Sequence, residues 1–241
     1  MPELPILTYH RIGDPGIGPE GITISPREFE MQMDLLEEKG IVSLTLRAFL
    51  KALLGNRGRS GRHVLITFDD GYEETYSLAW PILRERGLMA TVLMTTGRIG
   101  RANFWDESGK RLKLLSTKQI LELRSAGWDF GSHAHHHPHL ATLSESEART
   151  EIGRSKRVLE KILGEPVLSF CYPYGECSTN VKRLVCSEGF VCAFASDTGP
   201  KDFRKDPFEI RRIGIFPGLS RAGFLRKVSG FYHRYRKMTG R

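Results

Sequence analysis

Short apolar runs alternate with longer amphipathic stretches along almost the whole chain, and this alternation limits the folds open to it. The clearest run is His63–Phe68 (HVLITF), which is continuously apolar, as expected for a strand buried on both faces. Helical patterns separate such runs. Seven or eight strand–helix units of this kind favour a closed or nearly closed parallel barrel over a doubly wound sheet. The 241 residues suit one such α/β domain.

Two of the predicted helices carry explicit boundary signals. Ser25 with Pro26 is typical of an N-cap followed by proline at the first helical position, and Gly40 ends that helix. Ser144 and Glu147 form a predicted capping box. The apolar runs predict strands over 6–9, 41–44, 63–68, 90–95, 128–131, 167–171, 190–195 and 208–213, and the C-terminal stretch predicts a basic helix over 219–237.

The net charge of +8 is concentrated at one end of the chain. Residues 201–241 contain 12 Lys or Arg and 3 Asp or Glu, a net of +9, so the first 200 residues carry 24 minus 25, or −1. We predict a barrel over 1–217 and a basic C-terminal helix over 218–241, packed on it or appended to it. Such a helix can lie against an anionic membrane surface, or simply face solvent. Nucleic acid is not an expected partner, because no recognised nucleic-acid-binding module is present.

Cysteine usage and the N-terminal sequence bear on the compartment. The four cysteines form no CxxC pair and match no zinc-ribbon spacing, which favours free thiols in a reducing compartment. No signal peptide and no apolar run long enough to span a membrane is visible. We therefore expect a protein that is cytoplasmic or peripheral at the membrane, and extracellular if the N-terminus has been trimmed.

Polar residues follow the predicted strands at the end where a barrel places its functional groups. Asp69 and Asp70 come directly after the strand over 63–68, and His133 follows the strand over 128–131. Adjacent residues at a strand end point in different directions, so one carboxylate can bind a metal ion while the other faces a substrate. Capping of the next helix is the alternative role for such an aspartate.

Five of the eight histidines lie within seven residues, from His133 to His139. Zinc binds neutral imidazole nitrogens, and a catalytic zinc usually has three protein ligands and one open position. His133 and His137 can converge on one ion if the loop makes a helical turn that ends before Pro138. An Asp-His-His set most often holds zinc, but also accepts Co²⁺, Ni²⁺ or Fe²⁺. A histidine-rich polar loop without a metal is the alternative interpretation.

The combination of TFDDGY (67–72), SHAHHHP (132–138) and YPYG (172–175) resembles the polysaccharide deacetylase family, the chitin-deacetylase-like metal-dependent carbohydrate esterases. The resemblance covers roughly residues 6–215. It implies a distorted (β/α)7-8 barrel, a divalent metal ion, and removal of N-acetyl groups from an amino sugar in a polysaccharide, glycoconjugate or lipid-linked precursor. The pattern is most similar to the biofilm-polysaccharide branch, which opens with a Tyr-His segment such as Tyr9-His10.

The resemblance assigns roles by position, and its implied metal ligands are Asp70, His133 and His137. Asp69 would be the general base that takes a proton from the attacking water. A backbone N–H near Tyr174 would hold the oxyanion of the tetrahedral intermediate. In the same turn, Tyr172 and Pro173 would line the substrate.

Two departures from the family pattern concern the general acid and an arginine. Many members supply the acid from a late Leu-x-His motif, which residues 209–216 lack. His10 is predicted to replace it, because a barrel closes its last strand against its first. Many members also carry an arginine two residues before Pro-Tyr-Gly, where this chain has Cys171. Arg211 or Arg212 can substitute for that arginine, and the sequence does not decide between them.

The predicted loop over 96–116 is long enough to overhang the barrel mouth. Exposed aromatic side chains stack on sugar rings, so Trp105 in this loop is a predicted substrate contact; packing of the loop onto the barrel is the alternative. Some relatives of the family act on cyclic amides or ureides, so hydrolysis of another non-peptide C–N bond is the alternative activity. A non-catalytic protein with a degenerate barrel, which binds an anionic surface or nucleic acid through its basic C-terminal segment, is the third interpretation.

Overall fold

A parallel sheet forms the centre of the computed structural model, which describes residues 4–19, 21–54, 62–106, 111–200 and 202–232. The sheet order is β10-β1-β5-β6-β7-β8-β9. Its strands are β1 (Ile6–Tyr9), β5 (His63–Phe68), β6 (Thr91–Met94), β7 (Asp129–Ser132), β8 (Ser169–Cys171), β9 (Cys192–Phe194) and β10 (Ile213–Gly214). In addition, β4 (Val42–Ser43) pairs with β5, and β2 (Arg11–Ile12) pairs with β3 (Thr23–Ile24). These pairings are parallel, as the βα alternation predicted.

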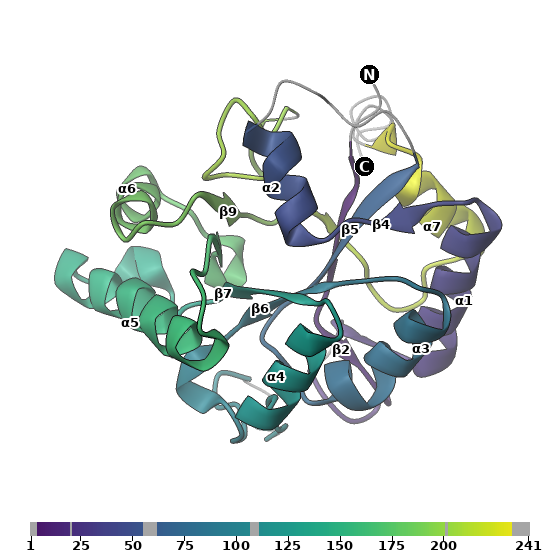
Figure 1. Cartoon of the computed structure of the whole chain (residues 1–241), viewed down its shortest axis with the longest axis horizontal. Coiled ribbons are helices and arrows are strands. Elements are labelled where there is room, and N and C mark those ends of the chain that lie inside the picture. The colour runs from purple at the N-terminus through teal and green to yellow at the C-terminus, as the bar shows by residue number, and fades with distance from the viewer. Residues whose placement is uncertain (1–3, 20, 55–61, 107–110, 201, 233–241) are drawn as a thin grey trace.

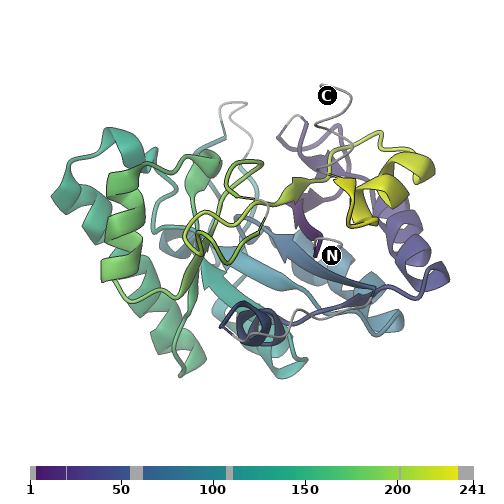
Figure 2. The same cartoon turned by 90° about the horizontal axis from the view of Figure 1, so that it is seen from above.

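The segment 210–214 closes the sheet into a distorted barrel. Ile210 forms a parallel bridge with Phe194 of β9, and the Arg212 N–H donates to Ser196 O at 2.7 Å. The same segment then continues as β10, which pairs with β1 (Figure 2). The segment 210–214 is therefore the neighbour of both β9 and β1. The predicted barrel is confirmed.

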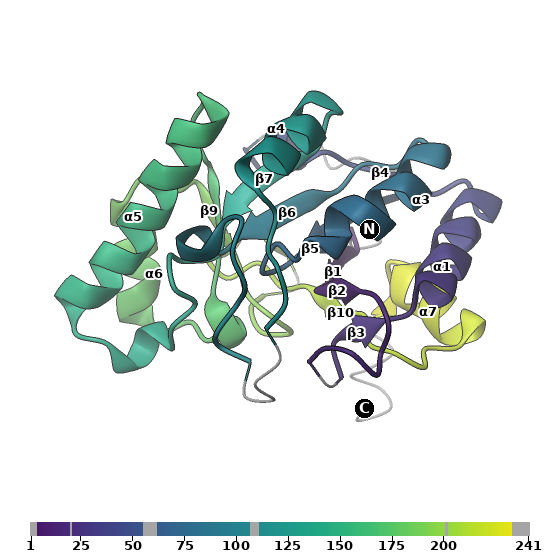
Figure 3. The ribbon, with the colours of Figure 1, turned by 90° about the horizontal axis from the view of Figure 1, so that it is seen from below.

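Helices surround the strands (Figure 1). They are α1 (Pro26–Glu38), α2 (Leu46–Leu54), α3 (Trp80–Glu85), α4 (Thr117–Ser125), α5 (Glu145–Leu163), α6 (Thr179–Ser187) and α7 (Arg221–Val228). α1 and α7 lie together on one flank, and α5 and α6 on the other (Figures 1 and 3). Both predicted helix starts are present: Ser25 accepts from the Glu28 N–H, and Ser144 and Glu147 form their capping box.

Strand alternation sorts the barrel residues into two sets. One set packs outward against the helices and includes Leu7, Ile66, Val92 and Phe170. The other points inward and forms an apolar cluster with α2; it includes Ile6, Leu65, Phe194 and Ile210. Because side chains alternate with a period of two, the inward set continues toward the carboxyl ends of the strands. It ends there with Thr8, His10, Thr67, Asp69, His133, Cys171 and Arg212.

The helical segment that follows the aspartate pair is divided near Pro81. Thr75–Ala79 is a π-helical turn in which the Trp80 N–H bonds to Thr75 O, and α3 follows it. Proline has no N–H, so the regular bond from position 81 to Ser77 O cannot form. The wider turn accommodates that missing bond.

The C-terminal helix is shorter than predicted. α7 ends at Val228, and Gly230, with a φ of 73°, lies beyond its end, so the continuous helix over 219–237 is wrong. Phe224 and Val228 of α7 are buried in the core, so the apolar side of this short helix packs on the barrel. The described part of the helix gives no support to the predicted membrane contact, and residues 233–241 lie outside the described residues. Among the helices described, none is both long and apolar enough to cross a membrane.

Candidate active site

Two adjacent carboxylates leave the end of β5 in different directions, as predicted. The Asp69 N–H donates to Tyr9 O at 2.9 Å, which continues the pairing with β1 and keeps the Asp69 side chain on the inner face. At Asp70 the backbone enters the left-handed region, with a φ of 68°. Gly71 follows with a φ of 83°, and an added Cβ there would collide with Met94 Sδ. This turn separates the two carboxylates.

His133 and His137 meet at one oxygen of Asp70. The His133 Nε2 lies 3.5 Å and the His137 Nε2 lies 3.3 Å from Asp70 Oδ1, and all three side chains are buried. The predicted helical turn between the histidines is wrong, because the backbone over 133–137 is not helical. Instead, Ala134 and His137 adopt left-handed φ values of 61° and 60°. These two residues produce the convergence that a helical turn was expected to give.

The protonation of this cluster suits a divalent cation. His133 Nδ1 lies 2.9 Å from Cys171 O; a carbonyl only accepts, so Nδ1 carries the proton and Nε2 keeps a lone pair. Burial lowers the pKa of His133 to about 4, so the ring is neutral at pH 7. Asp70 Oδ1 is buried and has no hydrogen-bond donor among the described residues. One carboxylate oxygen and two imidazole nitrogens therefore converge, and the set fits a divalent metal ion.

Arg212 holds the other carboxylate. Its Nη1 and Nη2 donate to Asp69 Oδ1 and Oδ2, both at 2.7 Å, as a bidentate pair between buried groups. The guanidinium is itself fixed, because Nη1 also donates to Thr67 Oγ1 and Nε donates to Ala195 O. Arg211 donates instead to Gly199 O. Of the two arginines that the sequence left open, Arg212 is the one beside Asp69.

The charge of Arg212 decides the ionisation of Asp69. Burial alone would raise the pKa of the Asp69 carboxyl, but the Arg212 guanidinium and its hydrogen bonds bring that pKa well below its usual range. Asp69 is therefore a carboxylate at neutral pH. Its orientation and its ionisation both depend on the same arginine.

Cys171 stands where the family pattern has an arginine, and Arg212 reaches Asp69 from the closing segment 210–214. Arg212 Nη2 lies 3.0 Å from Cys171 Sγ, and this sulfur lies 3.7 Å from Asp69 Oδ2. Burial raises the pKa of the Cys171 thiol well above its usual value, so the thiol is neutral. Asp69, His133 and Cys171 also come within ligand distance of one another. Because both Asp69 oxygens bind Arg212, however, the Asp70 cluster is the candidate metal site.

His10 lies at the carboxyl end of β1 beside Asp69. Its Nε2 is 3.9 Å from Asp69 Oδ2, and a quarter of its side chain is exposed. The neighbouring positions of β1 and β5 in the sheet bring this N-terminal residue to the aspartate. His10 therefore lies beside Asp69. It directly follows β1, the strand with which β10 pairs.

Two aromatic side chains flank His137. Trp105 stacks on its ring with a centroid distance of 4.8 Å and an interplanar angle of 23°, so it packs the loop onto the cluster. Tyr174 approaches the same ring edge-on, at 4.6 Å and 69°. Tyr174 belongs to the short turn η4 (Pro173–Gly175) and has a left-handed φ of 58°. Tyr174 remains 46% exposed beside the candidate metal ligand.

Tyr172, a predicted substrate contact, faces away from this centre. Its side chain is fully buried, packs on Phe170 and donates its hydroxyl to Phe208 O at 2.8 Å. Phe170 and Tyr172 alternate with Cys171, which points inward, so both side chains point outward and pack against the helices. The prediction that the Tyr172 side chain contacts substrate is therefore wrong. Pro173 is buried in the next turn, and its contact with substrate stays a prediction.

The remaining histidines of the loop have local partners. His135 Nδ1 lies 2.8 Å from Thr96 Oγ1, and His136 Nδ1 lies 2.7 Å from Glu151 Oε1. The Glu151 carboxylate also accepts from the backbone N–H groups of both histidines. These contacts fix the loop backbone between the two candidate metal ligands.

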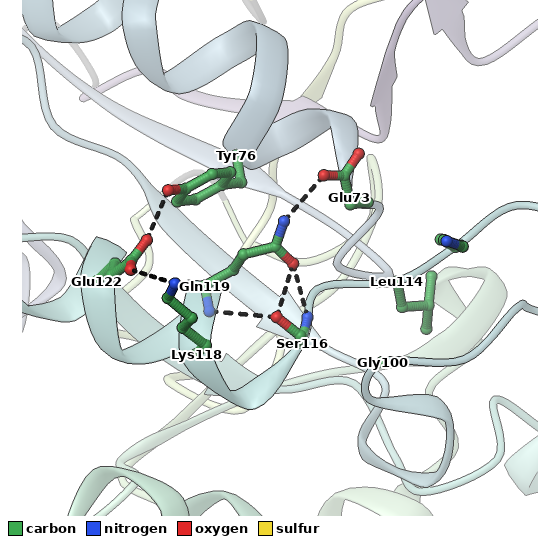
Figure 4. Close-up of a pocket in the computed structure, with 9 residues that line it drawn as sticks. Glu73, Tyr76, Gly100, Leu114, Ser116, Lys118, Gln119 and Glu122 are labelled. Carbon is green, nitrogen blue, oxygen red and sulfur yellow. Dashed lines mark hydrogen bonds and ion pairs between the residues drawn. The ribbon is translucent and has the colours of Figure 1, made fainter.

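A separate cavity of about 520 Å³ lies between the π-helical turn and the start of α4. Its polar side chains bond to one another (Figure 4): Tyr76 donates to Glu122 at 2.5 Å, and Gln119 donates to Glu73 at 2.8 Å. Gln119 also completes the capping box of α4. None of the candidate catalytic residues lines this cavity.

The chain is similar to known deacetylases over most of its length. The family model described as polysaccharide deacetylase matches residues 56–193, more than half of the chain. The poly-β-1,6-N-acetyl-D-glucosamine N-deacetylase of Staphylococcus epidermidis is 29% identical over 201 residues, which cover 79% of this chain and 67% of that relative.

Two solved structures share the fold. The Streptococcus pyogenes deacetylase PplD, in complex with acetate, has a TM-score of 0.81 at 25% identity, covering 94% of this chain and 98% of the other. IcaB from Ammonifex degensii has a TM-score of 0.80 at 23% identity, covering 96% and 98% of the two chains. The chain therefore belongs to the polysaccharide deacetylase family and is a metal-dependent carbohydrate N-deacetylase.

Proposed function

We propose that this enzyme hydrolyses the N-acetyl group of N-acetylglucosamine units within a poly-N-acetylglucosamine chain. The observation that carries the proposal is the buried Asp70–His133–His137 cluster beside Asp69, a carboxylate held by Arg212. The substrate class is supported by the Staphylococcus epidermidis relative, whose name states that substrate. Aromatic side chains next to His137 also suit a polymer of sugar rings.

Asp70, His133 and His137 would hold the metal ion, which we propose to be zinc. One carboxylate oxygen and two imidazole nitrogens match a catalytic zinc site with three protein ligands. The same set accepts Co²⁺, Ni²⁺ or Fe²⁺. When bound, the ion supplies Lewis acidity that polarises the acetyl carbonyl.

Asp69, His10 and Tyr174 would carry out the proton transfers and stabilise the charge. Asp69, kept ionised by Arg212, accepts a proton from the attacking water. His10 delivers a proton to the nitrogen of the leaving amine as the C–N bond breaks. The backbone N–H of Tyr174 donates to the oxyanion of the tetrahedral intermediate. The products are acetate and the free amino sugar.

Acetate release from a β-1,6-linked N-acetylglucosamine tetramer tests this function. Purified enzyme supplied with zinc should release acetate and leave a cyclic ureide such as hydantoin intact. A strong chelator should abolish the release, and zinc should restore it. Ring opening of the ureide without acetate release would replace N-deacetylation by the alternative C–N hydrolysis. Full activity after chelation would contradict the role of the metal.

Replacement of His10 by glutamine tests the general acid. We expect kcat for the tetramer to fall by about a hundred- to ten-thousandfold, because the leaving amine loses its proton donor. An aryl acetate serves as the control substrate, since its phenolate leaves without protonation; its hydrolysis should fall far less. Equal losses on the amide and the ester would show that His10 supports the site in some other way.

A further inference from the structure

An exposed pair of stacked rings extends outward from the candidate metal site. Tyr174 and His139 stack with a centroid distance of 3.8 Å and an interplanar angle of 7°. Tyr174 also meets the edge of His137, so the pair starts at a candidate metal ligand. The two residues come from different loops, one after β7 and one after β8. Their stacking covers one face of each ring, so the pair presents the outer face of His139 and the exposed ring edges beside the reaction centre.

Glu176 fixes the orientation of this pair. Its Oε2 lies 3.0 Å from His139 Nδ1, and about half of each side chain is exposed. The turn that carries Tyr174 and Glu176 is constrained by Gly175, whose φ is 71° and where an added Cβ would collide with Ser196 Oγ. The stacked pair is therefore held from both loops, and the Glu176 carboxylate lies beside the exposed His139 ring.

A carbohydrate polymer matches the chemistry of this surface better than a small acetylated molecule does. Aromatic faces take the C–H faces of pyranose rings, and a few polar groups at the rim take the hydroxyl groups. Trp105 already covers the ring face of His137, so the chain does not need the Tyr174–His139 pair to shield that histidine. Two stacked, half-exposed rings next to a catalytic centre are placed to contact the sugar beside the one that reacts.

We propose that Tyr174 and His139, oriented by Glu176, form a subsite for the pyranose ring adjacent to the N-acetylglucosamine unit undergoing deacetylation. The inference rests on the proposed function and adds a preference for oligomers over the monosaccharide. The stacking of one sugar ring should raise kcat/KM for a tetramer over that for the monosaccharide by about five- to tenfold, the range of one aromatic contact.

Chain-length dependence tests the subsite, with N-acetylglucosamine and its β-1,6-linked tetramer as substrates of the zinc-supplied enzyme. His139 is the residue to substitute, because the N–H of Tyr174 belongs to the proposed oxyanion site. In His139→Ala the tetramer-to-monosaccharide ratio of kcat/KM should fall to about one, mainly through KM for the tetramer. His139→Phe, which keeps a flat ring, should retain most of the ratio. Phe231→Ala, at another exposed aromatic, is the matched control.

Each outcome separates the subsite from the function on which it rests. Absence of acetate release from both substrates by the unmodified enzyme would defeat the proposed function. Release from both, with the same loss for each substrate in His139→Ala, would overturn the subsite. A His139→Phe variant as impaired on the tetramer as His139→Ala would overturn stacking as its basis. An unmodified enzyme with no preference for the tetramer would overturn the subsite as well.

Discussion

Substitution of Asp69 by asparagine is expected to lower kcat for acetate release by about a hundred- to ten-thousandfold while the enzyme keeps its full content of metal. The amide has nearly the same shape as the carboxylate but cannot take a proton from water at neutral pH. Both Asp69 oxygens bind Arg212, whereas the candidate ligand set consists of Asp70, His133 and His137. Acetate release and metal content, measured on the same preparation, test the assignment.

Asp70→Asn is the matched variant one residue further along the chain. It should lose both metal and activity, because Asp70 Oδ1 is the point where the two imidazoles converge. The loss of affinity should exceed the roughly 10- to 100-fold that removal of a ligand's hydrogen-bond partner costs. Metal retention in Asp70→Asn together with metal loss in Asp69→Asn would exchange the roles of the two aspartates.

Replacement of Arg212 by methionine is the second change with a large expected effect. It leaves Asp69 buried without its cation and without two hydrogen bonds, and breaking a buried pair in this way costs about 3–5 kcal/mol of stability. We expect kcat/KM to fall by about a hundredfold or more, since a mispositioned base loses most of the general-base contribution. Thermal unfolding and acetate release, each measured with metal content, separate instability from lost catalysis.

Arg211→Met is the control for that experiment, because the neighbouring arginine donates to Gly199 O and not to Asp69. It should retain activity close to that of the unmodified enzyme. A second test moves the cation: Arg212→Met combined with Cys171→Arg restores an arginine to the position common in the family. Recovery of part of the activity is expected, since Cys171 Sγ is 3.7 Å from Asp69 Oδ2. An Arg212→Met enzyme as stable and as active as Arg211→Met would refute the role of Arg212.

The features predicted well from the sequence are those with local causes. The capping signals at Ser25 and Ser144 lie within one turn of the helix ends that they define. The apolar run of β5 needs burial on both faces and so implies a parallel sheet. The two aspartates follow that strand directly, and their divergence follows from backbone geometry at a strand end.

The features that were missed depend on backbone conformation or on strand phase. Ala134 and His137 adopt left-handed conformations without any glycine to signal them, so the path of the histidine loop could not be read from residue types. Arg212 could be distinguished from Arg211 only by knowing that Ile210 points into the barrel, and the short closing segment shows no clear alternation. Likewise, Tyr172 follows the three-residue strand β8, which is too short for its sequence to show which side chains point into the barrel.

The position of the closing segment 210–214 in the sheet bears on when the protein becomes active during its folding. Asp69 and Arg212 are 143 positions apart, and the arginine takes its place only when the segment 210–214 inserts between β9 and β1. Closing so long a loop costs more entropy than forming local contacts, so we expect this pairing to form after the local elements. A nascent chain that has exposed the Asp70, His133 and His137 ligands but not yet residue 212 could capture a metal ion before it has a working base. Catalytic competence would therefore arrive last in the maturation of this protein, with the docking of its final strand.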